Sequence, residues 1–253
     1  PADITRLRTQ ATVACLRCDV AQADSVQAVQ TWLADQQWPS VAGVIHAAGV
    51  LTDGTLPNQS VEKLQLAYAA KVHGAQHLRA SLKPSDFMVL YSSAAASFGA
   101  AGQASYAAAN AALDALARTW SQAGEQVLSV QWGAWQEAGM AVRHDAVKRA
   151  EQAGFGSISP ALGRNVLAQL LAQGKRGTVF VSPMDWQRLR FELPLIARFR
   201  PAQQRNAAQA GARAAAHADM AKSSHDSAQL LTMVRRAALE AIGYQSRDVL
   251  DTM

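Results

Sequence analysis

Short apolar runs alternate along the first part of the chain with longer segments whose apolar residues recur every three to four positions. The short runs are rich in β-branched residues and predict strands near 11–18, 41–46, 86–92, 126–132 and 178–182. The longer segments predict helices near 24–36, 60–82, 104–123 and 160–173. Because strict alternation of strand and helix leads to a parallel sheet with helices on both faces, the pattern predicts an α/β fold with a doubly wound parallel sheet.

Residues that directly follow the predicted strands are candidates for a ligand site, because ligands of such sheets bind outside the carboxyl ends of the strands. They are Asp19, the run from His46 to Gly49, Ser92 and Ser93, and the run from Trp132 to Trp135. A carboxylate after a strand can accept from an adenine amine, and the small residues Ala47, Ala48 and Gly49 let a flat cofactor approach the backbone. The set predicts a dinucleotide site, although Gly49 alone is equally compatible with an ordinary turn. We interpret His46 as a hydrogen-bonded structural histidine.

The stretch YSSAAASFGAAGQASYAAANAALDAL places Ser93 at the end of a strand and Tyr106 near the start of an alanine-rich helix. Tyr106 and Asn110 are four residues apart and share a helix face. Serine and tyrosine hydroxyls that converge on a carbonyl oxygen suit its reduction, with the serine donating a hydrogen bond and the tyrosine a proton. Because the pKa of free tyrosine is about 10, a nearby cation that stabilises the phenolate is needed near neutral pH.

Lys71 is the candidate for that cation. In the predicted helix 60–82 it shares the register of the apolar residues, whereas Lys63 lies off that register near the helix start. The apolar register consists of Leu64, Tyr68, Ala75, Leu78 and Leu82. The register is equally compatible with a lysine whose stem packs while its amine reaches water. The need for a positive charge near Tyr106 favours the interpretation of Lys71 as the catalytic cation.

Composition and charge serve mainly to exclude classes of function. The chain has 253 residues, 49% of them hydrophobic, and a net charge of +5 without a basic stripe, so we expect a folded protein that does not bind nucleic acid. The absence of a long apolar run and of an export signal predicts a soluble, cytoplasmic protein without membrane association. Cys15 and Cys18 fall in the predicted strand 11–18, where side chains three apart point to opposite faces. We therefore expect two packed cysteines rather than a metal or disulfide site.

The series Lys71, Ser93, Tyr106 and Asn110, with VIHAAGVL before it and WGAW…GMA after it, resembles the ketoreductase domains of modular polyketide synthases, a branch of the short-chain dehydrogenase/reductases. Those domains carry Y-x-x-x-N with a remote lysine where most of the superfamily carries Y-x-x-x-K. The resemblance extends from about Cys18 to Pro194. It implies NADPH-dependent reduction of a β-ketoacyl thioester on an acyl carrier protein to a β-hydroxyacyl thioester, with further synthase domains in the same polypeptide.

The resemblance also implies a role for each site residue. Tyr106 would donate the proton, Ser93 would donate a hydrogen bond to the carbonyl, Lys71 would lower the tyrosine pKa, and Asn110 would belong to the proton-relay network. No metal is implied. The lid would run from about Met140 to Phe155. The residues implied to line the NADPH site are Asp19, Val20, Ala47, Ala48, Gly49, Lys71, Tyr106, Trp132 and Gly133.

Stereochemistry is also partly implied by the resemblance. B-type ketoreductases carry an L-D-D element after the HAAG run, and A-type members carry a tryptophan eight residues before the tyrosine. This chain has Leu51, Thr52 and Asp53 at the first place and Phe98 at the second. The retained Asp53 favours the B type. The proline that marks epimerising B-type members two residues after the tyrosine is replaced by Ala108.

The family binds pyrophosphate on a G-x-G-x-x-G loop, and no such run occurs in this sequence. We therefore expect the first βαβ part of the fold to be missing and residues 1–197 to be the remaining portion of the catalytic domain. Residues 198–228 are rich in Ala, Gln and Arg and predict a flexible linker. The helical pattern within 229–253 resembles the first helix of an acyl carrier protein, with a lone helix docked on the domain as the alternative.

Two other function classes stay open at this point. A non-catalytic, ketoreductase-like structural domain would be favoured by loss of the tyrosine or the lysine, and both are present. A free-standing short-chain alcohol dehydrogenase predicts lysine at position 110, where Asn stands, and no carrier-like tail.

Overall fold

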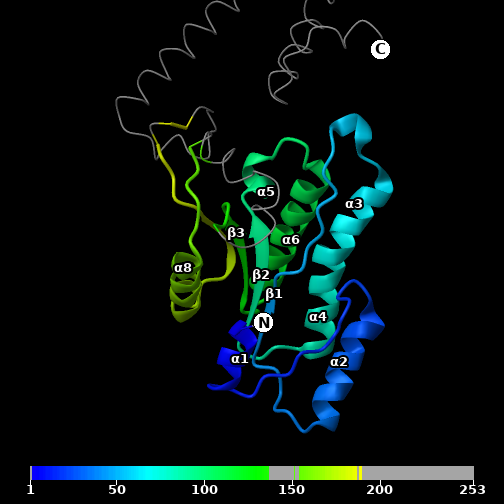
Figure 1. Ribbon diagram of the computed structural model, residues 1–253. Helices are drawn as coiled ribbons and strands as arrows, with labels where there is room; N and C mark the ends of the chain where they lie inside the picture. The colour runs from blue at the N-terminus through cyan, green and yellow to red at the C-terminus, as the bar shows by residue number, and fades with distance from the viewer. Residues whose placement is uncertain (1, 137–150, 152–153, 187, 190–253) are drawn as a thin grey trace, which may run out of the picture.

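The computed structural model describes residues 2–136, 151, 154–186 and 188–189 (Figure 1). The predicted linker at 198–228 and the predicted carrier-protein helix within 229–253 lie outside the described residues. Of the predicted lid at 140–155, the structure describes residues 151, 154 and 155.

A parallel sheet of four strands, in the order β1-β2-β3-β4, forms the centre of the described part of the chain (Figure 1). The strands are β1 (Gly43–His46), β2 (Phe87–Ser93), β3 (Val127–Trp132) and β4 (Gly177–Val181). All three neighbouring pairs are parallel, and the register places Ser93 opposite Trp132. Four of the five predicted strands are therefore confirmed within about two residues at each end.

Helices cover both faces of this sheet (Figure 1). They are α1 (Ala2–Arg8), α2 (Ala23–Asp35), α3 (Val61–Tyr68), α4 (Gly74–Leu82), α5 (Ala95–Phe98), α6 (Ala104–Gln122) and α8 (Pro160–Ala172), with a short 3-10 turn η1 (Leu56–Asn58). Residues of α4 and α6 pack on one face of the strands, and residues of α8 pack on the other. The doubly wound α/β fold is therefore confirmed.

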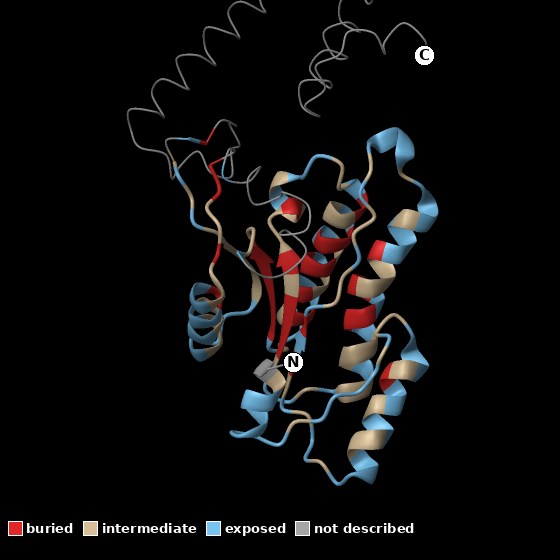
Figure 2. Ribbon diagram, viewed as in Figure 1, coloured by how far each residue is buried: buried red, intermediate tan, exposed pale blue. Residues whose placement is uncertain are grey.

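The strands supply both halves of the core because successive side chains point to opposite faces. Met88 and Leu90 of β2 pack with α4 and α6, whereas Val89 packs on the side of α8. Figure 2 shows buried residues concentrated on the strands and on the sheet-facing side of α6. The carboxyl ends of the strands are thereby fixed by packing on two sides.

The predicted strand at 11–18 is wrong. These residues form no regular element, Cys15 is exposed, and Cys18 is half-buried, so the two cysteines are not packed in a core. Both thiols are free. A strand is stabilised by hydrogen bonds to a neighbour, and the sheet of the described residues has no strand paired along this segment. Apolar composition without a pairing partner was therefore not enough to make the segment a strand.

The predicted helix 60–82 is present but interrupted. Between α3 and α4 lies a π-helical turn, η2 (Ala69–His73), in which the Gly74 N–H donates to the Ala69 carbonyl, five residues back. An extra residue in the turn rotates the residues after it by roughly 100° relative to a continuous α-helix. Consequently Ala75 is fully buried while Leu64, predicted on the same face, is exposed. Lys71 lies within the π turn and is buried.

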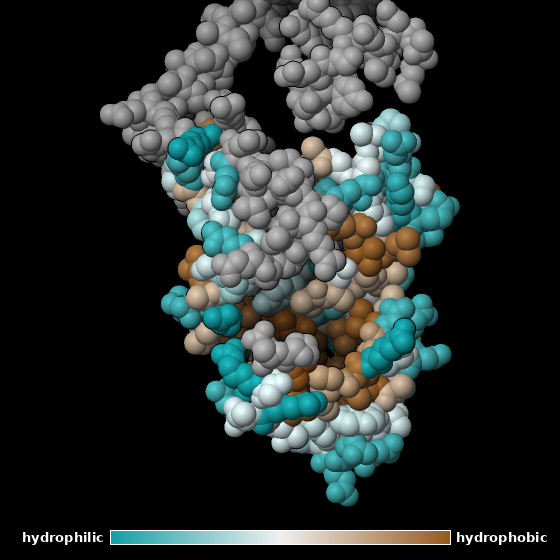
Figure 3. Space-filling model, viewed as in Figure 1, coloured by the Kyte–Doolittle hydropathy of each residue, from teal (hydrophilic) through white to brown (hydrophobic). Residues whose placement is uncertain are grey.

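Strand β1 forms one edge of the sheet, since it pairs with β2 alone among the described strands. Its Ile45 is 52% exposed, and Val50 in the following loop is exposed as well. Figure 3 shows hydrophobic surface in the middle of the face on which this edge lies in Figure 1. The edge and its apolar side chains are thus open to a neighbour.

A hydrogen bond from His46 joins β1 to the π turn. Its ring is 2% exposed, and Nε2 lies 2.9 Å from the Lys71 carbonyl oxygen, so Nε2 carries the proton and donates it. Burial lowers the pKa of His46 from 6.5 to about 4, while the hydrogen bond to the Lys71 carbonyl acts in the opposite direction. The interpretation of His46 as a hydrogen-bonded structural residue is confirmed.

We expect the folded chain to lose stability as pH falls from 6.5 toward 4. The unfolded chain binds a proton at His46 over this range, and the folded chain excludes it. A shift from 6.5 to about 4 corresponds to roughly 3 kcal/mol. The free energy of unfolding, measured in urea at pH 7 and at pH 4.5, should fall less in His46→Gln, whose side chain can still donate to the Lys71 carbonyl. Equal losses in the two proteins would contradict the assignment of this loss to His46.

Candidate active site

The carboxyl ends of the strands bring the predicted site residues to one edge of the sheet. Ser93 ends β2, the run Ala47 to Gly49 follows β1, and Trp132 ends β3 beside Ser93. Helix α6 begins at Ala104 and carries Tyr106 in its first turn. Strand ends and a helix start, rather than a long loop, position these groups, which keeps their geometry precise.

Tyr106 is the meeting point of the candidate catalytic residues. Burial raises the pKa of Tyr106 above 10, the neighbouring Ser93 and Asn110 side chains act to lower it, and the negative charge of Asp53 raises it further. The phenol is therefore held in its protonated form, ready to donate.

Lys71 lies beside this tyrosine, with Nζ 5.8 Å from the centre of the Tyr106 ring. The side chain is 3% exposed, and Nζ donates to the Tyr91 carbonyl oxygen at 2.7 Å. Burial lowers the pKa of Lys71 to about 8, while the charge of Asp114 acts to raise it. The Lys71 amine is therefore buried in the core and does not reach water.

The role expected for Lys71, which is to lower the pKa of Tyr106, stays a prediction. Burial is the largest effect on the pKa of Tyr106 and raises it, while Ser93 and Asn110 act to lower it. The Lys71 ammonium is bonded to a backbone carbonyl of β2.

Asn110 lies one helical turn after Tyr106 and is fully buried. Its Nδ2 donates to the Tyr106 carbonyl oxygen at 2.8 Å, which ties the amide to the backbone of α6. Its Oδ1 is buried without a hydrogen-bond partner. A buried acceptor without a partner is costly, so this atom is available to a donor that enters the site.

Lys63, the alternative lysine, lies elsewhere. It belongs to α3 and its Nζ donates to the Asn58 carbonyl oxygen at 2.7 Å, where it closes the turn η1. Of the two lysines, it is therefore Lys71 that lies beside Tyr106, as the helix register predicted. The π turn nevertheless changes the register after it.

The predicted cofactor residues fall into two groups. Asp19 is exposed and its Oδ1 accepts from the Ala21 N–H at 3.0 Å, while Val20 lies against α4, where a Cβ on Gly74 would come within 2.9 Å of Val20 Cγ2. Ala47, Ala48 and Gly49 follow β1 and are exposed or half-buried. Together they form an accessible, small-residue edge that fits a flat ligand.

Trp132 and Gly133 form the second group, and the structure explains them by packing. The Trp132 side chain is buried in the core on the side of α8, although its Nε1 has no hydrogen-bond partner. A Cβ on Gly133 would lie 2.4 Å from Ser182 Oγ, so a glycine is required here for the close approach of β4. The Trp132 side chain therefore packs on the side of α8 rather than toward α6, the helix that carries Tyr106.

The two predicted stereocontrol residues have different partners. Asp53 accepts two hydrogen bonds from Gln103 Nε2, at 3.2 and 3.1 Å, and the Gly54 N–H donates to the Gly102 carbonyl oxygen at 2.8 Å. The loop around Asp53 is therefore tied to the start of α6. Phe98 ends α5 and packs against Phe155 and Phe180, with ring centres 5.0 and 5.1 Å apart.

Sequence reasoning missed a buried polar network behind the site. Asp114 lies four residues after Asn110 on the same face of α6, and its carboxylate accepts from Ser129 and Gln131 of β3. A second missed contact is Ser105 Oγ, which donates to Gln59 Oε1 at 2.6 Å. Helical spacing from Tyr106 through Asn110 to Asp114 was the available signal for the first.

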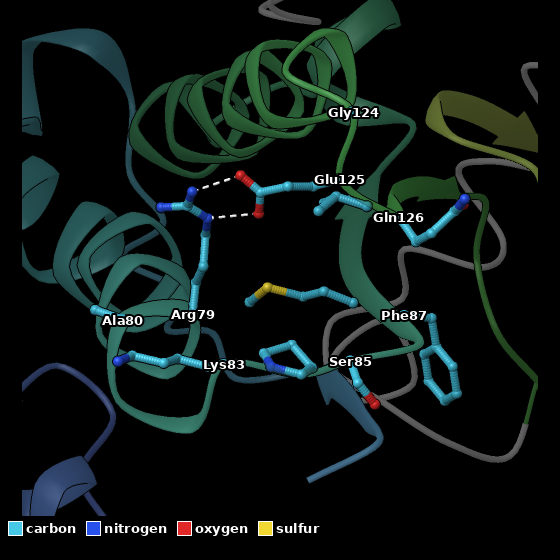
Figure 4. A pocket seen from close by; sticks show the side chains of 11 residues that line it. Arg79, Ala80, Lys83, Ser85, Phe87, Gly124, Glu125 and Gln126 are labelled. Atoms are coloured by element: carbon cyan, nitrogen blue, oxygen red, sulfur yellow. Dashed lines mark hydrogen bonds and ion pairs between the residues drawn. The ribbon is translucent and has the colours of Figure 1, made fainter.

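A pocket of about 450 Å³ lies at the opposite, amino end of the sheet (Figure 4). Arg79 of α4 and Glu125, just before β3, form an ion pair across it, with Arg79 Nε 2.7 Å from Glu125 Oε2. None of the predicted site residues lines it. Since ligands of parallel sheets bind at the carboxyl ends, we do not assign the active site here.

Two other properties of the described residues concern ligands and membranes. Within them, no group of three or more His, Cys, Asp or Glu side chains is placed to hold a metal ion. No helix among them has the length and apolar character needed to cross a membrane.

Comparison with known proteins identifies the family. Residues 2–137 match the family model described as KR domain. The chain is 39% identical over 178 residues to polyketide synthase GfsA of Streptomyces halstedii, a match that covers 70% of this chain and 2% of that protein. It is 35% identical over 175 residues to 6-methylsalicylic acid synthase of Aspergillus niger, which covers 68% of this chain and 10% of that protein.

A solved structure gives the same result. PlmKR1, the ketoreductase from the first module of phoslactomycin biosynthesis in Streptomyces sp. HK803, superimposes with a TM-score of 0.66 at 35% identity, covering 76% of this chain and 44% of that one. The chain thus spans a small part of the curated relatives and less than half of this structure. Its sequence, its parallel sheet and its matching relatives together show that the chain belongs to the KR domain family, the ketoreductases of polyketide synthases.

Proposed function

We propose that this chain forms the catalytic part of an NADPH-dependent β-ketoacyl reductase. The substrate is a β-ketoacyl thioester on the phosphopantetheine arm of an acyl carrier protein, and the product is the β-hydroxyacyl thioester. The observation that carries the proposal is the buried Lys71 ammonium 5.8 Å from the centre of the Tyr106 ring, with Asn110 Nδ2 bonded to the Tyr106 backbone carbonyl and the Ser93 side chain acting on the pKa of the phenol.

The chemistry follows from what each group can donate. The Ser93 hydroxyl and the Tyr106 hydroxyl offer two hydrogen bonds to one carbonyl oxygen, which polarises the carbonyl. As the carbonyl carbon is reduced, its oxygen gains negative charge and takes the proton from Tyr106. The positive charge of Lys71 then stabilises the phenolate that remains, and Asn110 keeps the tyrosine backbone and side chain in place. NADPH supplies the hydride when bound.

The residues present fit one part of that cofactor. We propose that Asp19 and Val20 contact its adenine end and that Ala47, Ala48 and Gly49 lie along it, because these residues form an accessible, small-residue edge at the carboxyl ends of the strands. Lys71 and Tyr106 are proposed to meet its nicotinamide end. Trp132 and Gly133 are proposed to contact the cofactor with backbone atoms only. The Trp132 ring packs against Tyr91, and the lack of a side chain at Gly133 makes room for Ser182.

The partners are proposed from the relatives. Polyketide synthase GfsA and 6-methylsalicylic acid synthase are two relatives of which this chain matches a small share. We therefore propose that the chain works beside other synthase domains and receives its substrate from an acyl carrier protein.

We expect Tyr106→Phe to lower the rate of reduction of a β-ketoacyl thioester by several orders of magnitude in the intact enzyme, because Tyr106 is the proton donor of the proposed chemistry. NADPH affinity, measured by fluorescence titration, should be nearly unchanged. Tyr68→Phe, at a tyrosine of α3 that packs against His73, is the matched control and should keep the normal rate. Retention of a tenth of the rate by Tyr106→Phe would defeat the assignment.

We propose B-type stereochemistry because Asp53 is retained and is held beside the start of α6 by Gln103. Chiral chromatography of the product should show one predominant configuration, that of the B type. Asp53→Ala should lower the ratio of the two configurations roughly tenfold, the effect of losing about 1.4 kcal/mol of discrimination. Product of A-type configuration from the unaltered enzyme would refute the proposal, whatever the variant does.

A further inference from the structure

The Asp53 loop, residues 52–54, is held in place by a side chain outside the candidate catalytic set. Gln59 follows the turn η1, and its Nε2 donates to the Thr52 carbonyl oxygen at 3.2 Å and to the Gly54 carbonyl oxygen at 3.0 Å. A Cβ on Gly54 would lie 3.2 Å from this nitrogen, so the glycine permits the close approach. One amide group thus spans the loop that carries Asp53.

The same amide group also reaches helix α6. Gln59 Oε1 accepts from Ser105 Oγ at 2.6 Å, and Ser105 directly precedes Tyr106 in the first turn of the helix. The orientation of the amide is fixed, because the two loop carbonyls can only accept hydrogen bonds and therefore require its nitrogen. Gln59 thus links both carbonyls that flank Asp53 to the helix that carries the phenol.

The other side-chain link between the Asp53 loop and α6 is more exposed. Gln103 Nε2 donates to both carboxylate oxygens of Asp53, an exposed residue, so water competes for these hydrogen bonds. Ser105 is only 6% exposed. A buried hydroxyl left without its partner costs more free energy than an exposed one, so the contact between Gln59 and Ser105 is the firmer of the two links.

The Asp53 loop borders the candidate active site. The Gly54 N–H donates to the Gly102 carbonyl oxygen at 2.8 Å, just before the helix that carries Tyr106. The negative charge of Asp53 also acts on the phenol, whose pKa it raises. A side chain that fixes the loop on α6 therefore fixes the position of Asp53 relative to Tyr106.

We propose that Gln59 is a positioning residue that holds the Asp53 loop on the first turn of α6 and thereby directs how the substrate meets Tyr106. Gln59 contacts no reacting atom in this role, because it acts through the backbone of the loop and through Ser105. The inference rests on the proposed function, in which Asp53 controls the configuration of the product.

The first test measures the loop without cofactor or turnover. Exchange of the Gly54 amide hydrogen is followed by NMR in the full chain of 253 residues. Gln59→Leu removes all three hydrogen bonds and should speed this exchange roughly fivefold, the effect of one net hydrogen bond. Asn58→Ala, the matched control, removes a contact with Thr55 Oγ1 in the same turn and should leave the exchange unchanged. Unchanged exchange in Gln59→Leu overturns the inference.

The second test reads the product of the intact enzyme by chiral chromatography. We expect Gln59→Leu to lower the ratio of the two product configurations roughly fivefold, with NADPH affinity nearly unchanged, and Asn58→Ala to keep the ratio. Faster Gly54 exchange with an unchanged ratio would show that the loop does not direct the substrate, and the inference would fall.

Failure of the proposed function gives a different result in the same experiment. The ratio is read whichever configuration predominates, so an A-type product from the unaltered enzyme refutes the proposed stereochemistry alone. An unaltered enzyme that gives no reduced product refutes the proposed function itself.

Ser105→Ala covers the case in which Gln59→Leu does not fold. It removes the hydrogen bond to Gln59 Oε1 from the α6 side, and should speed Gly54 exchange and lower the product ratio in the same direction. Where both single variants fold, Gln59→Leu/Ser105→Ala should show no larger effect than Gln59→Leu alone, because both remove one link. Additive effects, or a silent Ser105→Ala, would show that Gln59 does not act through α6, and the inference would be overturned.

Discussion

The candidate site depends on the burial of one positive charge. Lys71 is held in the core by a π turn, with its ammonium on the Tyr91 carbonyl and its backbone carbonyl on His46. Water is removed from the ammonium, so its charge acts strongly on its neighbours and its proton is weakly held, with a pKa of about 8. The other features of the site either make this burial possible or use the charge that results.

The contacts of Lys71 also join the elements that carry the site. Through His46 they reach β1, through Tyr91 they reach β2, and through the ring of Tyr106 they reach α6. Two further groups of α6, Asn110 and Asp114, extend the same face toward β3. The core of this half of the sheet and the candidate catalytic centre are therefore one packed unit, in which a substitution of Lys71 removes contacts with β1, β2 and α6.

The parallel sheet and the grouping of Ser93, Tyr106, Asn110 and Lys71 could be predicted from sequence. Period and spacing report directly on strands, helices and shared helix faces, and these features survive tertiary packing. The register of helix 60–82 could not be predicted as well, because a π turn changes the rotation of the chain without leaving a mark in composition. Lys71 was chosen because the need for a cation, and not only the register, pointed to it, and it lies beside the Tyr106 ring.

The failures have a common physical origin. The segment 11–18 has strand composition, but a strand exists only with a hydrogen-bonded neighbour, which its own sequence does not encode. The buried hydrogen bonds of Asp114, which the sequence did not reveal, depend on which side chains of β3 face it. Each is a property of three-dimensional neighbours.

The central claim, that the site is built around a buried lysine with a lowered pKa, is tested most directly by the titration of Lys71 in the unaltered chain. With 13C at lysine Cε, we expect one lysine with a midpoint near pH 8, and we expect this signal to be the one lost in Lys71→Met. A Lys71 signal that titrates near 10.5, the ordinary value for lysine in water, would contradict the claim.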